Sequence, residues 1–536
     1  MSLVDLDFIQ QNITSDNGPE VPYIWSHGAN QLHIGDGIVI YALIQQIRAK
    51  VCVCLGSGGG FIPRIMTQAR RDLYNQGIFQ GDSCERWGSI GGTWIVDACN
   101  GVGGHVSWAD EDSFFRKEFQ PAFIRDTTEN AFYNFFVKQN IKIDFLHIDA
   151  DHSYEGVKRD FELYSQIMNP GGIISLHDSD PSYEPHLIVT EEHKATWDKF
   201  DGPGRLVQEL DASWEKIKLF NEGKLKNAPS TTGLTIVQKK EPKLHLVTVV
   251  GDFHKNLTLI QMIKHYQNMV DDMTVVHYVA GKKSQAESGQ EQVEFSEYLN
   301  KFLGNYTRKI KILTVTGQKY DWDKVTEYYN LVTSTAENPE DWWIISDSDE
   351  FQEWPGDPKK YVKRAENLHC TFITGGFLDR VGEDGTFPKI EGPKDDLDAK
   401  FPLVGFFRYP MSGACPNKVV AVKTGQKVCS GQHYAVFPDG TNSWGTSHPL
   451  RFPVQKCFVE VHHFKWDETV LNRLKETGES GCSYSEEYLK MRDAILNAGE
   501  RIQVQNPEYR IERYNPELEY HSYSQWEEVR DKIISV

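Results

Sequence analysis

The stretch from Ile141 to Asp178 reads IKIDFLHIDADHSYEGVKRDFELYSQIMNPGGIISLHD, and it decides the fold of the first half of the chain. The apolar run at 141–148 is typical of a strand that is buried on both faces of a parallel sheet. Apolar residues at helical spacing follow at 157–168, and the run Asn169-Pro170-Gly171-Gly172 is expected to end that helix. A second short strand is expected over 172–176. The stretch therefore predicts one βαβ unit with a right-handed crossover.

Polar side chains follow both predicted strands at the point where each strand ends. Asp149 and Asp151 come after the first strand, and His177 and Asp178 come after the second. Ligands of open α/β sheets bind beyond the carboxyl ends of the strands. If the two strands are neighbours, about 5 Å apart, Asp149 and Asp178 can share one divalent cation. The alternative is that Asp151 or Ser153 serves only as the N-cap of the following helix.

Length and composition set the class of protein. A chain of 536 residues is too long for one ordinary domain and indicates roughly two to four. The net charge of −19 argues against a nucleic-acid partner. No apolar segment approaches the ~20 residues that a membrane span requires. The nine cysteines are odd in number and form no CxxC pair, which favours reduced thiols and a cytoplasmic protein.

A charged break divides the chain near residue 240. The run Lys239-Lys240-Glu241-Pro242-Lys243 separates a last apolar strand over 233–237 from a new strand that begins at Leu244. We therefore predict a first domain over residues 1–240 and a second over residues 244–536. Residues 1–34 give no functional signal apart from the aromatic Tyr23 and Trp25.

A glycine-rich turn follows the first predicted strand, Val51–Leu55. The turn reads Gly56-Ser57-Gly58-Gly59-Gly60, and a helix begins near Ile62. Glycines at such a turn let a ligand approach the backbone and the helix N-terminus. Their spacing is G-x-G-x-G rather than the G-x-G-x-x-G of dinucleotide sites. The next strand, Thr93–Val96, ends in Asp97, which is either a ribose-binding acid or an ordinary turn aspartate.

Together these segments resemble class I S-adenosylmethionine-dependent methyltransferases, and most of all the metal-assisted sugar O-methyltransferases. The resemblance covers about residues 35–237 and rests on LGSGGG (55–60), Asp97, HIDADHSYEGVKRDF and PGGIISLHD. It implies that S-adenosylmethionine lies on the glycine turn, with Asp97 on its ribose; the turn residues are Gly56, Ser57, Gly58 and Gly60.

The same resemblance implies a divalent metal, Mg²⁺ or Mn²⁺, near the acceptor hydroxyl. Asp149 and Asp178 would hold it, and His177 stands where related sequences often have another acid. His152 or Asp151 is the candidate base that takes the hydroxyl proton. The other interpretation of His152 is a helix-start histidine that is bonded to backbone.

The second half of the chain again alternates predicted strands and helices, which is typical of an α/β domain with a parallel sheet. Its fourth strand, over 342–346, ends in Asp347-Ser348-Asp349-Glu350-Phe351. Two acids at D-x-D spacing at a strand end can chelate a metal that carries a diphosphate. Many acidic turns contain the same spacing, so the prediction of a metal site depends on the position of this motif at the end of a buried strand.

Residues 244–480 resemble glycosyltransferases of the GT-A fold, of a family-2-like type with a DxDEF motif. The segments that carry the resemblance are WWIISDSDEFQEWP (342–355), GGFLDRVGEDG (375–385) and VEVHHFKW (459–466). It implies a nucleotide-sugar donor and a metal on Asp347 and Asp349. A late histidine would complete the metal shell, for which the candidates are His463 or His462, and also His433.

The resemblance leaves the acceptor base of the second domain open. Asp379 and Glu383 are the candidates, and Arg380 either contacts phosphate or pairs with Glu383.

The expected fold class is therefore α/β with two Rossmann-like parallel-sheet domains. The leading prediction is a bifunctional cytoplasmic enzyme of glycan or polysaccharide biosynthesis. It would methylate a sugar hydroxyl and transfer a sugar from a nucleotide-sugar donor to a glycan or sugar acceptor. One alternative is a single-activity enzyme in which the other domain is a scaffold. Another is a first domain of related fold that transfers no methyl group.

Overall fold

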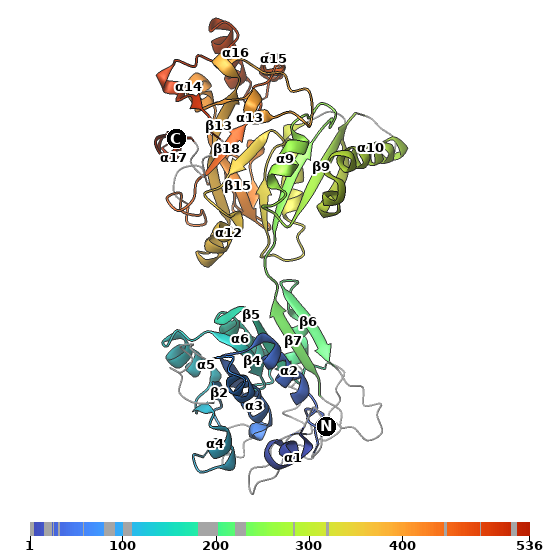
Figure 1. The fold of residues 1–536 in the computed structure, drawn as a ribbon, viewed down its shortest axis with the longest axis vertical. Coiled ribbons are helices and arrows are strands. Elements are labelled where there is room, and N and C mark those ends of the chain that lie inside the picture. Colours follow the sequence, from blue (N-terminus) through green and yellow to red (C-terminus); the bar gives the residue numbers. More distant parts are fainter. Residues whose placement is uncertain are drawn as a thin grey trace. The chain divides into compact units, whose positions relative to one another are not determined.

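The computed structural model describes residues 5–14, 24, 26–30, 33–56, 58–79, 92–99, 110–180, 202–219, 232–281, 285–317, 321–443, 448–482, 484–515 and 523–535. The chain forms two compact units, Met1–Glu241 and Pro242–Val536 (Figure 1). No helix among these residues combines the length and the apolar character needed to cross a bilayer.

The first unit is built on a seven-stranded sheet in the order β3-β2-β1-β4-β5-β7-β6. The parallel strands are β1 (Cys52–Leu55), β2 (Thr93–Val96), β3 (Ala122–Ile124), β4 (Ile143–Ile148) and β5 (Met168–His177). The strand β7 (Leu234–Lys239) runs antiparallel to both β5 and β6 (Trp214–Leu219). The parallel part confirms the predicted βαβ unit, and the antiparallel pair at its edge was not predicted.

Helices cover both faces of the central part of this sheet, which explains why β1 is apolar and β4 is largely so. Cys52 and Cys54 face one core together with α2 (Gly37–Ile47) and α3 (Phe61–Asn75). Val53 and Leu55 face the other core, which contains residues of α6 (Tyr154–Ser165) and α8 (Gly202–Glu209). Shorter helices are α1 (Leu6–Phe8), α4 (Phe114–Phe119) and α5 (Thr128–Ala131), with π-helical turns at Ile9–Ile13 and Phe132–Val137.

The expected end of the α6 helix was wrong. The helix ends at Ser165, and the run Asn169–Gly172 lies inside β5. Ile143 pairs with Met168 and Phe145 with Ile173, so these extra residues form a bulge in the ladder. Gly171 adopts a φ of +77° there, which favours glycine. Proline is tolerated because the regular ladder resumes only at Ile173.

The second unit is built on a ten-stranded sheet, of which eight strands follow the order β10-β9-β8-β11-β15-β13-β14-β19. The strands β8 (Leu244–Val250), β9 (Asp272–Ala280), β10 (Ile310–Gly317) and β11 (Trp342–Ile345) are parallel. Antiparallel pairs follow, through β15 (Asn417–Lys423), β13 (Phe372–Val381), β14 (Leu403–Gly405) and β19 (Glu512–Arg513). Off this path, β12 (Glu350–Glu353) pairs antiparallel with β18 (Val459–His463), which lies parallel to β13.

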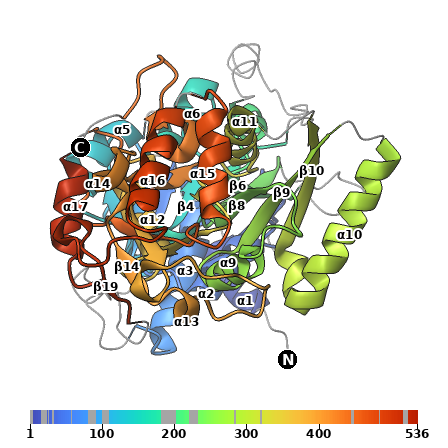
Figure 2. The ribbon, with the colours of Figure 1, turned by 90° about the horizontal axis from the view of Figure 1, so that it is seen from above.

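The expectation of a parallel sheet is therefore right for residues 244–345, whereas the rest of the second unit is mixed, with antiparallel pairs apart from β13 and β18. The strand-helix alternation that predicts parallel pairing stops at β11, and the later strands no longer need crossover helices. The helices of the parallel part are α9 (Leu259–Tyr266), α10 (Gln285–Leu303) and α11 (Trp322–Thr333), and α10 packs beside β9 and β10 (Figure 2).

The remaining helices surround the antiparallel part. They are α12 (Pro358–Asn367), α13 (Leu397–Lys400), α14 (Arg408–Ser412), α15 (Val470–Glu479), α16 (Ser485–Asn497) and α17 (Trp526–Ile534), and a small hairpin joins β16 (Lys427–Val428) to β17 (Ala435–Val436). Trp526 and Ile533 of α17 are buried in a core with Leu378 and Phe458. The C-terminal helix thus completes the second unit.

Each sheet has a point where the strand order changes direction. In the first unit the chain runs from β1 to β2 and β3 on one side, and then to β4 and β5 on the other. In the second unit β9 and β10 follow β8 on one side, and β11 lies on the other. Ligands of open α/β sheets bind at this switch point, beyond the carboxyl ends of the strands.

We predict that Gly56→Ala lowers the thermal unfolding midpoint more than Gly171→Ala. Both glycines have positive φ, 74° and 77°, so alanine costs about 1–2 kcal/mol at either position. A Cβ at Gly56 would lie 2.6 Å from the carbonyl carbon of Asp149, whereas a Cβ at Gly171 would meet no atom within 4 Å. Equal midpoints for the two variants would contradict this packing of β1 against the end of β4.

Candidate functional site

The ends of three neighbouring strands bring the predicted residues of the first unit together. Leu55 pairs with Val96 of β2 and with Ile148 of β4. The chain continues the same pattern for one more residue, because Gly56 N donates to Val96 O at 2.9 Å and Asp149 N donates to Leu55 O at 2.8 Å. Gly56 therefore lies between the strand that leads to Asp97 and the strand that leads to Asp149.

Two histidines and two aspartates form a compact cluster beside this point. Asp149, His152, His177 and Asp178, which we call the His–Asp cluster, each offer a donor atom, and these atoms all lie within 4.8 Å of one another. His152 Nε2 lies 3.2 Å from Asp149 Oδ1 and 2.8 Å from Asp178 Oδ2. His177 Nδ1 lies 3.1 Å from Asp149 Oδ1 and 3.3 Å from Asp178 Oδ1. Each imidazole therefore bridges the same two carboxylates.

Local backbone structure fixes the cluster. Asp178 has a φ of 51°, in the left-handed region, which turns the chain sharply after β5. The hydroxyl of Thr232 donates to the carboxylate of Asp178 and also contacts Ser26 O at 3.0 Å. Because Ser26 and Thr232 are distant in sequence, a segment before the first strand and the start of β7 both support the cluster.

The structure separates Asp151 from the cluster. Ser153 is the N-cap of α6, since its Oγ accepts from Gly156 N at 3.1 Å. Asp151 is exposed and accepts from Ser153 N at 2.9 Å. Asp151 thus shapes the turn before α6 and is not among the residues that the cluster brings together.

The cluster holds its charges as ion pairs. Burial alone would lower the pKa of His152, but its hydrogen bonds to Asp149 and Asp178 outweigh burial and raise that pKa to about 10. Burial would also lower the pKa of His177, but Asp178 and Asp149 outweigh burial, so the pKa of His177 is raised too. Burial would raise the pKa of Asp149 and of Asp178, but His177 and His152 hold both well below the usual range. In this arrangement His152 is a protonated partner of both aspartates, and its role as the base stays a prediction.

The donor set of the cluster fits a divalent cation. Two carboxylates and two imidazoles converge, and each imidazole would have to give up the proton that pairs it with the carboxylates. Imidazole nitrogen suits first-row transition metals better than Mg²⁺, which prefers oxygen ligands. Of the two metals that the sequence predicts, Mn²⁺ therefore fits these residues better.

The predicted cofactor residues lie at the same edge of the sheet. Gly58, Gly59 and Gly60 form a tight turn directly before the fifteen-residue helix α3, with φ values of 77° at Gly59 and 95° at Gly60. Asp97 follows β2, and its carboxylate accepts from Cys99 N at 2.7 Å. Ser57 lies outside the described residues.

Sequence reasoning missed several polar residues around the cluster. His147 is buried on β4, its Nε2 lies 3.9 Å from Asp149 Oδ2, and burial lowers its pKa to about 4. The ring of His27 lies against the ring of His177, with centroids 3.9 Å apart and planes tilted by 37°. No local motif marks His27 or Thr232, because only the tertiary fold brings them to the cluster.

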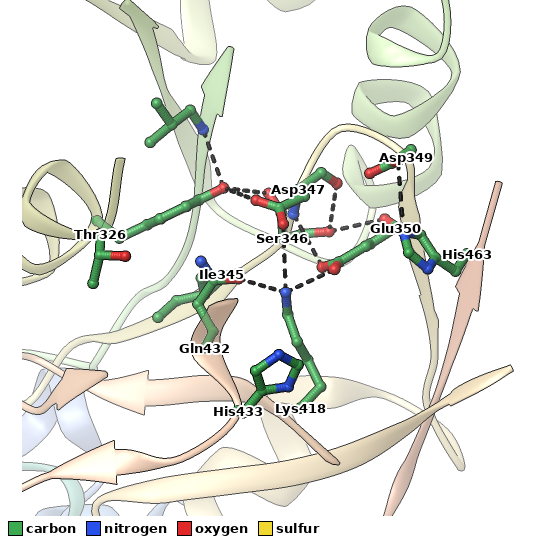
Figure 3. Close-up of polar contacts among 12 residues, drawn as sticks. Thr326, Ile345, Ser346, Asp347, Asp349, Glu350, Lys418, Gln432, His433 and His463 are labelled. Carbon is green, nitrogen blue, oxygen red and sulfur yellow. Dashed lines mark hydrogen bonds and ion pairs between the residues drawn. The ribbon is translucent and has the colours of Figure 1, made fainter. Parts of the chain in front are cut away.

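In the second unit, the acidic turn after β11 surrounds a buried lysine (Figure 3). Lys418 Nζ donates to Glu350 Oε1 at 2.7 Å, contacts Gln432 Oε1 and lies 3.6 Å from Asp347 Oδ2. Asp347 also accepts from the Tyr329 hydroxyl at 2.7 Å. Burial would lower the pKa of Lys418, but Glu350 and Asp347 outweigh it, so the lysine stays charged.

Asp349 turns the other way, toward a buried histidine. His463 Nε2 lies 3.5 Å from Asp349 Oδ2, and His463 Nδ1 lies 3.4 Å from Asp379 Oδ1. Asp379 accepts from Trp466 Nε1 at 2.7 Å and is only 1% exposed. Asp379 therefore orients His463 from behind and is not placed to deprotonate an acceptor, which corrects its expected role as a base.

The structure does not gather the predicted metal ligands of the second unit. Among the described residues, Asp347, Asp349 and His463 are not a set whose donor atoms lie within 4.8 Å of one another. Asp347 faces Tyr329 and Lys418, and Asp349 faces His463. As placed, these three residues do not fit a single shared cation.

The other predicted residues of the second unit have partners of their own. Glu383 is exposed and pairs with Arg513 instead of with Arg380, and its role as a base stays a prediction. Arg380 is buried instead against Asp398, at 2.8 Å, and the carbonyl of Phe401. His462 contacts Glu460 in the core at 3.2 Å, and His433 Nδ1 lies 2.8 Å from Asn417 O.

Comparisons with known proteins concern the first unit. Residues 53–179 match the family model described as a methyltransferase domain. A search of curated proteins finds no match.

Three solved structures show distant similarity to the chain. The O-methyltransferase from Bacillus cereus in complex with SAH is 14% identical with a TM-score of 0.28, over 44% of this chain and 90% of that chain. The O-methyltransferase TomG from Streptomyces achromogenes, in complex with SAM, is 11% identical with a TM-score of 0.28, over 44% and 96%. The SAH-bound methyltransferase PaMTH1 from Podospora anserina is 14% identical with a TM-score of 0.27, over 40% and 80%. Similarities this distant assign no activity to the chain.

We predict that replacing His152 with Gln in metal-free protein costs more stability near pH 6 than near pH 10. The pKa of His152 is raised to about 10 in the folded state, above the value near 6.5 of an unfolded histidine. A raised folded pKa contributes stability fully below the unfolded value, and this stability is lost as the pH rises through the folded value. Urea unfolding of both proteins in the presence of a chelator, across this pH range, measures the difference.

His33→Gln is the matched control, because His33 is exposed. We expect its effect on stability to be small at every pH. A His152→Gln effect that stays constant, or grows, between pH 6 and pH 10 would contradict the ion pairs of the His–Asp cluster.

Proposed function

We propose that the first unit is an S-adenosylmethionine-dependent O-methyltransferase. The observation that carries the proposal is the position of two elements at one switch point. The glycine turn leaves β1, and the His–Asp cluster leaves the neighbouring β4 and β5. A methyl donor on the turn and an acceptor hydroxyl at the cluster would then lie side by side, as methyl transfer requires. The match of residues 53–179 to a methyltransferase domain supports the same assignment.

In this proposal, Gly56, Gly58 and Gly60 let the cofactor approach the backbone, and Asp97 accepts hydrogen bonds from its ribose. Asp149, Asp178, His152 and His177 would hold a divalent cation, which lowers the pKa of an acceptor hydroxyl when it is bound. The acceptor class that we propose is a sugar, following the resemblance of this segment to sugar O-methyltransferases.

We predict that Asp97→Asn weakens binding of S-adenosylhomocysteine by about 10- to 100-fold. A hydrogen bond to a charged carboxylate contributes about 1.5–3 kcal/mol, and the amide keeps the shape without the charge. Isothermal titration measures the dissociation constant, and methyl transfer to a panel of nucleotide sugars and oligosaccharides, followed by mass spectrometry, reports the acceptor.

Asp211→Asn is the matched control. Asp211 accepts from Ser213 N in the turn before β6, and the first residue of β6, Trp214, pairs with the last residue of β7, Lys239. This turn lies at the edge of the sheet opposite the candidate site. Wild-type protein that binds no S-adenosylhomocysteine would refute the proposed function. Equal binding by both variants would remove Asp97 from the cofactor site.

For the second unit we propose glycosyl transfer from a nucleotide sugar. The observation that favours it is the acidic turn at the carboxyl end of β11, next to β8, where the strand order of the second sheet changes direction. Asp347 and Asp349 are about one-third exposed there, with side-chain exposures of 31% and 30%, so a ligand can reach both. Lys418 balances part of their negative charge, and Asp379 and His463 hold Asp349 in place. A chain with both activities would serve the synthesis of a methylated glycan.

We predict that the wild-type chain binds one of UDP, GDP, ADP or CDP together with Mn²⁺, and that Asp349→Asn weakens this binding at least about 10-fold, since a neutral amide is a poorer ligand than a carboxylate for the cation that the diphosphate carries. Isothermal titration with each diphosphate, with Mn²⁺ and with EDTA, measures binding and its dependence on metal. Asp439→Asn, in an exposed loop, is the control. No binding of any diphosphate would leave the second unit without the proposed activity.

A further inference from the structure

A second set of metal-ligating side chains lies directly beside the His–Asp cluster. His27, Asp36 and His177 each offer one donor atom, and these atoms lie within 4.8 Å of one another. All three are buried, with exposures of 2%, 7% and 2%. His177 belongs to both sets, so the second set extends the cluster toward the segment that precedes α2.

The fold holds this segment firmly against the end of β5. Ser26 O accepts from Thr232 N at 2.9 Å and lies 3.0 Å from Thr232 Oγ1. Asp36 N donates to His27 O at 2.8 Å, which closes a loop and brings Asp36 back to His27. Gly35 has a φ of 44°, and a Cβ there would lie 2.6 Å from the carbonyl carbon of Gly28. The loop is therefore built around a close backbone approach that leaves no room for a side chain.

His27 has an unused ring nitrogen in this buried place. Among the described residues, no hydrogen-bond partner reaches its Nδ1. A buried polar atom without a partner destabilises the fold, so its presence calls for a ligand.

The two other members each offer one atom to the same set. Asp36 directly precedes the eleven-residue helix α2, and the atom that it offers is a carboxylate oxygen. His177 faces the first set with Nδ1, as described above. Its Nε2 lies 3.3 Å from Ser26 O and 3.2 Å from Thr232 Oγ1, on the side of the N-terminal segment. One imidazole can therefore serve both sets of ligands through its two ring nitrogens.

We propose that His27, Asp36 and His177 form a binding site for a transition-metal dication of the zinc class, next to the cation site of the His–Asp cluster. Two imidazoles and one carboxylate select such ions over Mg²⁺ and Ca²⁺, which prefer oxygen ligands. A metal on Nε2 of His177 displaces the ring proton at that nitrogen to solvent. The bound ion fixes the segment around His27 to the edge of the sheet where the candidate site lies.

Counting bound zinc tests the proposal on the full-length chain. Protein stripped with a chelator is dialysed to equilibrium against Zn²⁺, and mass spectrometry of the metal gives the number of ions per chain. We expect His27→Phe to hold one zinc ion fewer than wild type. His33→Phe is the matched control, since His33 is an exposed histidine of the same segment, and it should hold the wild-type number.

Thermal unfolding distinguishes a metal ligand from a merely buried histidine. Phenylalanine keeps the volume of His27 beside Phe61, whose ring centroid is 5.4 Å away, and removes the unpartnered nitrogen. His27→Phe should therefore fold and be at least as stable as wild type in EDTA, while losing part of the stabilisation that Zn²⁺ gives to wild type. Asp36→Asn should also lose one zinc ion, which gives a second variant for the same site.

The same zinc number in wild type, His27→Phe and Asp36→Asn would overturn the proposal. Binding of S-adenosylhomocysteine is measured on the same samples, because it tests the methyltransferase assignment separately. Loss of that binding with an intact zinc difference would refute methyl transfer and leave the metal site standing.

Discussion

The contact between the backbone of Gly56 and the carbonyl of Asp149 is the constraint on which the first unit depends. Parallel strands bring their carboxyl ends to one edge, and here the two ends touch without an intervening side chain. A glycine turn that would bind a cofactor and an acidic turn that would bind an acceptor thus leave adjacent strands. This close approach determines how near a cofactor on the glycine turn and an acceptor on the acidic turn could come to each other. Transfer of a group between the two would depend on that distance.

The two units balance buried negative charge in different ways. In the first, His152 and His177 stand between Asp149 and Asp178, and their protons can be exchanged for another cation. In the second, Lys418 stands between Glu350 and Asp347, and a lysine side chain cannot leave. Removing one partner of a buried ion pair lowers the stability of the protein by about 3–5 kcal/mol. Each positive group is therefore retained unless another cation takes its place. This difference explains why only the first cluster gathers four ligand atoms in the way a metal site needs.

The sequence was informative where local pattern and topology coincide. The strands at Cys52–Leu55 and Thr93–Val96 are apolar because both of their faces are covered, and the βαβ rule alone placed Asp149 near Asp178. The antiparallel half of the second sheet was not predicted, because side-chain alternation does not encode the direction in which a neighbouring strand runs. His27 and Thr232 were missed for a related reason: each meets the cluster across more than fifty residues of chain. The suggested pair of Arg380 with Glu383 was wrong because Glu383 pairs with Arg513, which lies more than a hundred residues later in the chain.

The protonation of the His–Asp cluster links its structure to its proposed chemistry. Asp149 and Asp178 keep both His152 and His177 protonated, and a protonated imidazole cannot accept a proton from a hydroxyl. A divalent cation held by the cluster would take the place of these protons, and His152 would then be a ligand of the cation and not a base. The cation itself would lower the pKa of an acceptor hydroxyl, so the proposed chemistry needs no histidine base in the cluster.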